Sequence, residues 1–194
     1  MKIVLEKIIY KNILSVGATP VEIQLNKYHK TLITGRNGAS KSTMIEAIIF
    51  ALFGRPYRDI NKNQLINSIN KKGLVVELWF NINNKMKYYI KRGIKPNIFI
   101  IEKDGVPIVE DSSVRDFQKE LETDVLKMNY KTAKQIVALG TAGFTPFMQL
   151  KTYERRQIID DLLDIEVFSK MSENNKKQTD VISTTFDTVN NNIA

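Results

Sequence analysis

Residues 31–43 have the sequence TLITGRNGASKST, and this segment predicts the fold class of the chain. A short apolar stretch, Leu32–Ile33, precedes a loop with two glycines, and Lys41 and Ser42 open an apolar run typical of a buried helix. A strand, a GxxxxGK[ST] loop and a helix follow one another in this order in a phosphate-binding P-loop. The segment therefore predicts a P-loop α/β protein with a strand at Leu32–Ile33 and a helix over residues 43–53, ended by Gly54.

The residue types in the loop match what phosphate binding requires. Backbone N–H groups must turn toward the phosphate oxygens, which favours small residues, and the positive end of the helix adds to the attraction. Lys41 is placed to reach the β- and γ-phosphates, and the hydroxyl of Ser42 is placed to bind Mg²⁺. The predicted nucleotide-binding residues form one continuous run: Gly35, Arg36, Asn37, Gly38, Ala39, Ser40, Lys41, Ser42 and Thr43.

One position departs from the strict pattern, because Ser40 stands where the last glycine is expected. Serine is small, but it disfavours the positive φ that such a loop residue can require. The alternative is an ordinary turn in which Ser40 caps the following helix. The register of Gly35, Gly38, Lys41 and Ser42 favours the P-loop.

Composition excludes several other classes of site. The chain has 194 residues, no cysteine and the single histidine His29, which excludes disulfides and thiolate metal sites and argues against His-based catalysis. No run of 18 apolar residues occurs, so no membrane span is expected. The 29 basic and 21 acidic residues give a net charge of +8. This excess favours a polyanionic partner, with nucleic acid as the first candidate.

The remaining segments predict a mixed α/β architecture. Two strands, 2–10 and 21–25, precede the P-loop. Strands at 74–80, 87–92 and 97–101, with the Asp104-Gly105 turn leading into 106–109, predict an antiparallel meander. The strand aromatics Tyr88, Tyr89 and Phe99 are more typical of core than of stacking platforms. Helices are predicted from Val114 toward Leu121, over 131–139 and over 152–165.

Charged side chains also occur outside the loop. A solvated loop is the default for the first basic group, with nucleic-acid contact as the alternative, and the second group is predicted as a basic cluster on the meander. Glu46, the lone charge on the predicted helix, is either catalytic or paired structurally, and structural pairing is favoured. The first basic group lies in the polar connection 55–73 and the second on the meander: Arg55, Arg58, Lys62, Lys71 and Lys72, then Lys85, Lys87, Lys91, Arg92 and Lys95.

The C-terminal part has a seam of apolar residues at helical spacing. Ile182, Phe186, Val189 and Ile193 recur at intervals of four, three and four, which predicts the start of a coiled coil or an amphipathic terminal helix. The sequence also lacks a convincing hydrophobic strand ending in an acidic residue, which a complete P-loop ATPase needs. The chain is therefore expected to hold half of a nucleotide site.

Several stretches in a fixed order carry a family resemblance. They are YKNILSVG, KTLITGRNGASKSTMIEAIIFALFG, QLINSINKKGLVVELWF, KYYIKRG, QIVALGTAGFTPFM and RRQIIDDLL, and they run through most of residues 8–165. The set resembles the N-terminal half of the SMC-like DNA double-strand-break repair ATPases of the ABC class, SbcC type. The resemblance implies an ABC-ATPase head lobe over residues 1–165 and a coiled coil or amphipathic helix over 166–194.

The resemblance also implies a function. Such heads use ATP and Mg²⁺, clamp double-stranded DNA and control a Mre-type nuclease, in the cytoplasm and away from membranes. They work with the C-terminal half of the same ATPase and with a second head as a homodimer, so the isolated chain is expected to be inactive. The alternative is a free-standing half-head, a non-hydrolysing binding or regulatory module on DNA or on a repair ATPase.

Site residues carry over by position. Lys41 would be catalytic, and Ser42 with Thr141 would hold the metal. Leu14 stands where relatives often have an arginine. Thr141 lies three residues before Phe144, where relatives offer a Mg²⁺-binding glutamine. The metal ligands are therefore the part of the predicted site that departs furthest from the family.

Overall fold

The computed structural model describes residues 2–108, 114–138, 145–163 and 165–193. The chain divides into two compact units, residues 1–144 and 145–194. The first unit contains a β-sheet and the helices that cover it, and the second contains two further α-helices.

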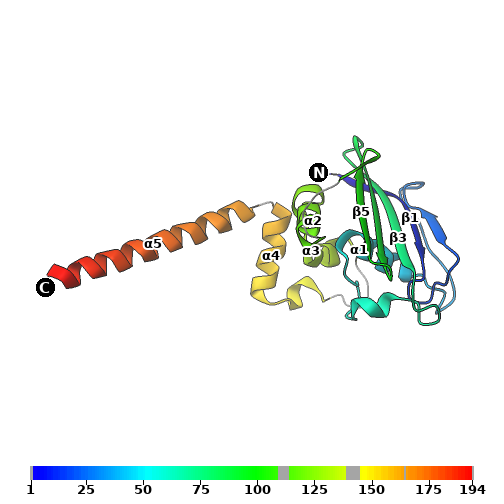
Figure 1. The fold of residues 1–194 in the computed structure, drawn as a ribbon, viewed down its shortest axis with the longest axis horizontal. Coiled ribbons are helices and arrows are strands. Elements are labelled where there is room, and N and C mark those ends of the chain that lie inside the picture. Colours follow the sequence, from blue (N-terminus) through cyan, green and yellow to red (C-terminus); the bar gives the residue numbers. More distant parts are fainter. Residues whose placement is uncertain (1, 109–113, 139–144, 164, 194) are drawn as a thin grey trace. The chain divides into compact units, whose positions relative to one another are not determined.

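The first unit is organised around one antiparallel sheet of six strands in the order β2-β1-β3-β4-β5-β6 (Figure 1). The predicted meander is confirmed as β3 to β6, and the two predicted N-terminal strands are confirmed as β1 and β2. Every neighbouring pair is antiparallel. The strands are β1 (Ile3–Lys11), β2 (Val21–Gln24), β3 (Leu74–Ile82), β4 (Met86–Ile94), β5 (Ile98–Lys103) and β6 (Val106–Pro107).

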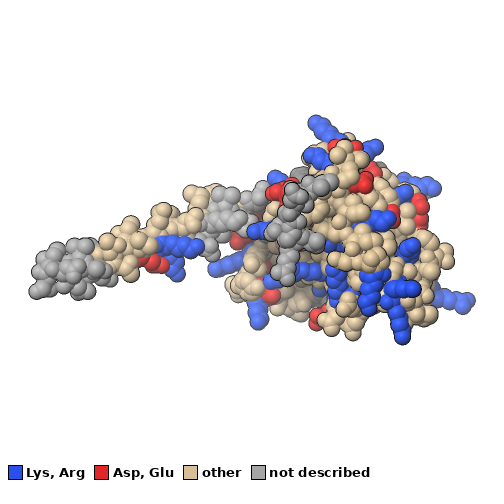
Figure 2. All heavy atoms as spheres, in the orientation of Figure 1, with Lys and Arg blue, Asp and Glu red and all other residues tan. Residues whose placement is uncertain are grey.

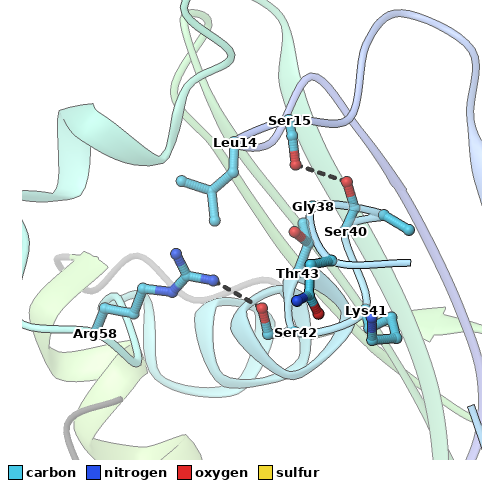
Figure 3. Close-up of a pocket in the computed structure, with 10 residues that line it drawn as sticks. Leu14, Ser15, Gly38, Ser40, Lys41, Ser42, Thr43 and Arg58 are labelled. Carbon is cyan, nitrogen blue, oxygen red and sulfur yellow. Dashed lines mark hydrogen bonds between the residues drawn. The ribbon is translucent and has the colours of Figure 1, made fainter. Parts of the chain in front are cut away.

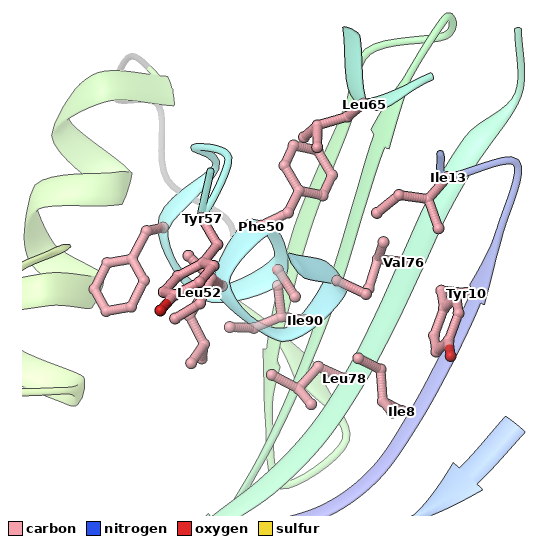
Figure 4. Close-up of a cluster of buried hydrophobic side chains, with 14 of the residues drawn as sticks. Ile8, Tyr10, Ile13, Phe50, Leu52, Tyr57, Leu65, Val76, Leu78 and Ile90 are labelled. Carbon is pink, nitrogen blue, oxygen red and sulfur yellow. The ribbon is translucent and has the colours of Figure 1, made fainter. Parts of the chain in front are cut away.

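The core lies between the sheet and helix α1 (Thr43–Phe53), which packs against one face of the sheet (Figure 4). Alternate residues of β3 face α1, because successive side chains of a strand point to opposite faces. Leu74, Val76, Leu78 and Phe80 are fully buried there, as is Phe50 of α1. Burying each such side chain contributes about 1.5–3 kcal/mol. The predicted burial of the helix after the P-loop is confirmed.

The C-terminus of α1 is fixed by a glycine and a buried arginine. Gly54 has a φ of 66°, and its N–H donates to the carbonyl of Phe50 at 2.8 Å. Nε of Arg92 in β4 donates to the carbonyl of Ala51 at 2.9 Å, and its guanidinium carbon lies 3.8 Å from the ring centroid of Phe99. Cations near a helix C-terminus are favourable, because they face the negative end of the dipole.

This arrangement corrects the predicted basic cluster on the meander. Arg92 is 5% exposed and faces the core, whereas Lys91 on the opposite face pairs with Glu77 at 3.0 Å. The alternation of side chains along β4 separates the two residues. Tyr88 stacks on Phe80 with ring centroids 5.2 Å apart, in agreement with the core interpretation of the strand aromatics.

The predicted strand at Leu32–Ile33 is not present. These residues have no strand assignment, and Leu32 is 87% exposed. A strand exists only where a neighbour completes its hydrogen bonds, and no strand of the described sheet pairs with this segment. The apolar side chains of Leu32 and Ile33 are therefore exposed on the surface of the first unit.

Short helices complete the first unit. The polar connection 55–73 contains one 3₁₀ turn, and α3 is capped by Asn129, whose side chain accepts the N–H of Thr132 at 3.0 Å. The predicted helix at 131–139 therefore starts slightly earlier and ends at Ile136. These elements are η1 (Lys62–Leu65), α2 (Val114–Glu120), the π-helix η2 (Leu121–Val125) and α3 (Tyr130–Ile136).

The second unit consists of η3 (Phe147–Gln149), α4 (Thr152–Leu163) and α5 (Glu166–Ile193). The predicted apolar seam belongs to α5, a single helix of 28 residues. Ile182 is 68% exposed, and the side chains of Phe186, Val189 and Ile193 lie outside the described part. Among the described residues, no helix is long and apolar enough to cross a membrane.

Candidate nucleotide-binding site

A cavity of about 400 Å³ lies where the predicted P-loop meets the start of α1 (Figure 3). Three segments far apart in sequence form it: the turn after β1, the P-loop with the first turn of α1, and the loop after α1. Their lining residues are Leu14, Ser15, Asn37, Gly38, Ala39, Ser40, Lys41, Ser42, Thr43 and Arg58. Seven of the nine predicted nucleotide-binding residues are in this set, and the exceptions are Gly35 and Arg36.

The loop backbone takes a left-handed conformation at two positions. Gly38 has a φ of 84° and Ser40 a φ of 60°. Ser40 therefore adopts the positive φ that serine disfavours and that the glycine of the strict P-loop pattern would adopt readily. The N–H of Ala39 donates to the carbonyl of Arg36 at 3.1 Å, and the N–H of Thr43 donates to that of Ser40 at 3.0 Å. The loop therefore folds tightly onto the helix start, as a P-loop does.

The interpretation of this segment as an ordinary capped turn is not supported. The N-cap residue of α1 is Ser42, with a φ of −74°, and its side chain makes no capping hydrogen bond. Ser40, the expected cap in that interpretation, lies two residues earlier. The hydroxyl of Ser42 instead accepts a hydrogen bond from Arg58 within the cavity.

The side chain of Lys41 folds back over the loop. Nζ donates to the carbonyls of Gly35 at 2.6 Å and of Arg36 at 2.8 Å. These two carbonyls, whose residues do not line the cavity, therefore hold the ammonium group against the loop. Both bonds are exposed and join a charge to neutral carbonyls, so a phosphate group can compete for the ammonium.

Arg58 reaches the same cavity from the loop after α1. Its Nη2 donates to Oγ of Ser42 at 2.8 Å, and its Nε lies 3.5 Å from a carboxylate oxygen of Glu46. Glu46 is fully buried, and its other carboxylate oxygen accepts the N–H of Tyr57. Burial raises the pKa of Glu46, while the Tyr57 N–H and the Arg58 charge act in the opposite direction. Structural pairing of Glu46 is confirmed.

Sequence reasoning missed Arg58 as a site residue and placed it among solvated basic side chains. A signal was available in the spacing of the helix. Glu46 lies four residues after Ser42, so both occupy the same face of α1. Since Gly54 and Pro56 end the helix and turn the chain back, a basic residue just after them can reach this buried carboxylate.

The turn after β1 contributes the other wall. Leu14 has a φ of 49°, and its N–H donates to the carbonyl of Leu65 at 2.7 Å. The hydroxyls of Ser15 and Ser40 are 2.6 Å apart and hydrogen bonded (Figure 3). Leu14 thus lines the cavity with an apolar side chain.

Thr141, the second predicted metal ligand, lies outside the described residues. The described segment before it ends at Ala138, whose carbonyl accepts the hydroxyl of Tyr57 at 2.8 Å. Within the described ranges, no group of three or more His, Cys, Asp or Glu side chains could hold a metal ion. A cation here would depend on the hydroxyl of Ser42 and on the phosphates of a ligand, which fits Mg²⁺ bound with a nucleotide.

Comparison with known proteins places the chain in a family. A family profile described as an AAA domain matches residues 7–193. Exonuclease subunit 2 of Escherichia phage RB69 is 56% identical over 174 residues, which cover 90% of this chain and 31% of that protein. The DNA double-strand break repair Rad50 ATPase of Methanopyrus kandleri is 24% identical over 176 residues, 87% of this chain and 19% of that one. The chain thus spans less than a third of the length of these relatives.

Solved structures agree with the predicted fold. The Smc head domain with an extended coiled coil from Pyrococcus furiosus, solved bound to the C-terminal domain of ScpA, matches with a TM-score of 0.62 at 23% identity. The match covers 91% of this chain and 46% of that one. The likeness confirms the ABC-ATPase head fold, and the relatives confirm the resemblance to SMC-like repair ATPases. The chain therefore belongs to the AAA-domain family, and it is similar to phage exonuclease subunits and Rad50 repair ATPases.

Proposed function

We propose that the chain is the ATP-binding half of a DNA repair ATPase head that clamps DNA and controls a partner nuclease. The observation that carries this proposal is the conformation of residues 37–43. The loop is left-handed at Gly38 and Ser40, and it sets Lys41 and Ser42 beside one cavity. This arrangement suits the triphosphate of ATP, and the relatives in phage and archaea bear names of nucleases and repair ATPases.

Each residue of the loop has a role in this proposal. The backbone amides of residues 35–40, apart from that of Ala39, bind phosphate oxygens. Lys41 leaves the carbonyls of Gly35 and Arg36 for the β- and γ-phosphates. Lys41 then stabilises the charge that develops on the transferred phosphoryl group. Ser42 holds Mg²⁺ through its hydroxyl, with Thr141 as the second protein ligand.

The proposed site is completed by other parts of the assembly. The exposed Leu32–Ile33 segment offers unpaired backbone and apolar side chains to the C-terminal half of the same ATPase. A second head would close the site as a homodimer, and a Mre-type nuclease would dock on the assembly. Residues 1–165 would form the head half, and residues 166–194 would begin a coiled coil or an amphipathic terminal helix. Hydrolysis is proposed only for the assembled protein.

Charge supports double-stranded DNA as the ligand of the clamp. The net charge is +8, and Figure 2 shows many lysine and arginine side chains on the visible face of the part that carries the sheet, with fewer acidic ones among them. Contacts of this kind go to phosphates and release counterions. Binding to duplex DNA should therefore weaken steeply as salt is raised, and equal binding at low and high salt would exclude this mode.

The test is ATP turnover by the full-length protein assembled with its nuclease subunit on DNA. Lys41→Ala should lower kcat on the order of 100-fold, because it removes charge stabilisation at the transferred group. Lys30→Ala is the matched control, since Lys30 is an exposed lysine that precedes the loop and does not line the cavity. Equal turnover by wild type and Lys41→Ala would overturn the proposal.

A second candidate function is a binding module that holds ATP without hydrolysing it. Ser40 in place of glycine and the hydrogen bond that holds the Ser42 hydroxyl on Arg58 favour this alternative. The same assembly distinguishes the two functions. Saturable binding of ATP with no turnover above the Lys41→Ala level supports the module, and turnover above that level supports the enzyme.

A further inference from the structure

We propose that Ser15 is a positioning residue of the phosphate loop: its hydroxyl holds Ser40 in the left-handed conformation that a glycine would adopt unaided. The inference rests on the proposed function, because it concerns the same nucleotide site. It assigns a role to a residue outside the P-loop pattern, located in the turn after β1. It also gives a physical reason why this chain tolerates a serine at position 40.

The backbone of Ser40 is in a strained conformation that would not be strained for glycine. Its φ is 60°, in the region where a Cβ atom crowds the neighbouring backbone. Its carbonyl accepts the N–H of Thr43 at 3.0 Å, so the strained residue is also the connection between loop and helix. If Ser40 relaxed to a negative φ, the amides on both sides of it would turn relative to the cavity.

The contact that opposes this relaxation comes from Ser15. The two hydroxyl oxygens are 2.6 Å apart, and both residues line the cavity. The residues are 25 positions apart in sequence, so the bond ties the loop to a different part of the fold. A hydroxyl can donate and accept at once, so either side chain can serve as donor in this pair.

The turn that carries Ser15 is anchored on both sides of that residue, which is what a positioning residue requires. The N–H of Asn12 donates to the carbonyl of Gly17 at 2.8 Å, and the N–H of Val16 to that of Ile13 at 2.9 Å. Leu14 is bonded on both sides, through its N–H to Leu65 and through its carbonyl to the side-chain amide of Asn67 at 2.7 Å. Ile13 is fully buried. The turn is thus anchored to the core, whereas residues 36–39 are exposed.

We expect the effect of Ser15 on nucleotide affinity to depend on which residue stands at position 40. In the full-length protein, Ser15→Ala should raise the dissociation constant for a fluorescent ATP analogue with Mg²⁺ by about three- to tenfold, the usual net value of one hydrogen bond. Ser15→Thr keeps a hydroxyl and should restore most of the affinity. In the assembled enzyme the KM for ATP should rise more than kcat falls.

The decisive variant replaces the constrained serine. Ser40→Gly removes both the strain and the bond, so its affinity should stay within about threefold of wild type. Ser15→Ala added to Ser40→Gly should then have no further effect. Ser68→Ala provides the matched control, because Ser68 is an exposed serine on a turn of the same unit. Thermal unfolding of every variant identifies losses that come from misfolding.

Two results would overturn the inference. One is unchanged affinity in Ser15→Ala, and the other is an equal loss with serine or glycine at position 40, which would mean that Ser15 acts independently of Ser40. Lys41→Ala separates this failure from failure of the proposed function. If Lys41→Ala loses affinity while Ser15→Ala does not, only the role of Ser15 is wrong. If wild type and Lys41→Ala bind equally, the nucleotide site itself is wrong.

Discussion

Arg58 donates a hydrogen bond to the hydroxyl of Ser42, with 2.8 Å between Nη2 and Oγ, although the residues are 16 positions apart. The bond places a positive charge at the hydroxyl that the P-loop pattern assigns to Mg²⁺. The buried carboxylate of Glu46, 3.5 Å from Nε of Arg58, holds the guanidinium there. A dication and a guanidinium at the same hydroxyl repel each other, so Arg58 would have to move if Mg²⁺ bound there as proposed.

Arg58→Ala should therefore lower the Mg²⁺ concentration needed for half-maximal ATP binding, by about two- to tenfold. The variant removes the guanidinium that occupies the Ser42 hydroxyl and would compete there with Mg²⁺. The measurement is a Mg²⁺ titration at fixed ATP in the full-length protein. Arg55→Ala is the control, because the guanidinium carbon of Arg55 lies 5.6 Å from the ring centroid of Tyr130 and the residue does not line the cavity. A higher Mg²⁺ requirement in Arg58→Ala would show that the arginine assists the metal instead.

Glu46 should make the stability of the protein depend on pH in a defined direction. Burial raises its pKa above the ordinary value of 4.5, so above pH 4.5 the folded state binds a proton that the unfolded chain has lost. The contribution of the carboxyl to stability is complete below pH 4.5 and declines as the pH rises through the folded pKa. In Glu46→Gln the side chain keeps its shape and an oxygen that can accept the Tyr57 N–H, but it does not titrate.

The free energy of unfolding of wild type relative to Glu46→Gln should consequently fall as the pH rises above 4.5. Denaturant unfolding of both proteins at several pH values in this range measures the difference. A relative stability that rises with pH would mean that the ion pair with Arg58 outweighs the cost of burial, and that the pKa of Glu46 is lowered.

Gly54→Ala should destabilise the first unit more than glycine replacement at another left-handed position. A Cβ at Gly54 would lie 2.5 Å from Nη1 of Arg92, whose guanidinium is buried and bonded to Ala51. Gly105→Ala is the matched control, since Gly105 has a φ of 81° and no atom within 4 Å of the added Cβ. It should cost about 1–2 kcal/mol from the backbone alone.

The cost of Gly54→Ala should exceed that of Gly105→Ala by about 1 kcal/mol or more, the usual penalty of overpacking. Chemical denaturation of the two variants gives the comparison directly. Equal losses would mean that Arg92 yields without cost and does not fix the C-terminus of α1.

The sequence pattern correctly predicted the elements whose formation depends on residues a few positions apart. The helix at Thr43–Phe53, its end at Gly54 and the antiparallel meander all follow from spacing and turn residues that act within a few positions. The strand at Leu32–Ile33 failed, because a strand depends on a partner that the described sheet does not supply. Arg92 was misplaced for a related reason: its charge suggested the surface, while the alternation along β4 placed it in the core.

The same distinction between local and long-range contacts separates the site residues that were predicted from those that were missed. The P-loop residues were predicted because their register is local, and seven of the nine line one cavity. Arg58 and Ser15 were not identified as site residues, since each reaches the cavity through folding of the chain over 16 and 25 positions. Contacts of this range have no signature in a single sequence beyond hints such as the spacing of Ser42 and Glu46.

Residues 35–43 are proposed to bind a nucleotide through Lys41, and the measurement that decides this is equilibrium binding of ATP with Mg²⁺ to the full-length protein. Saturable binding is expected, weakened by about 10- to 100-fold in Lys41→Ala through loss of a charge-assisted hydrogen bond, while Lys30→Ala should bind as wild type does. No binding by the wild type, or equal binding by Lys41→Ala, would contradict it.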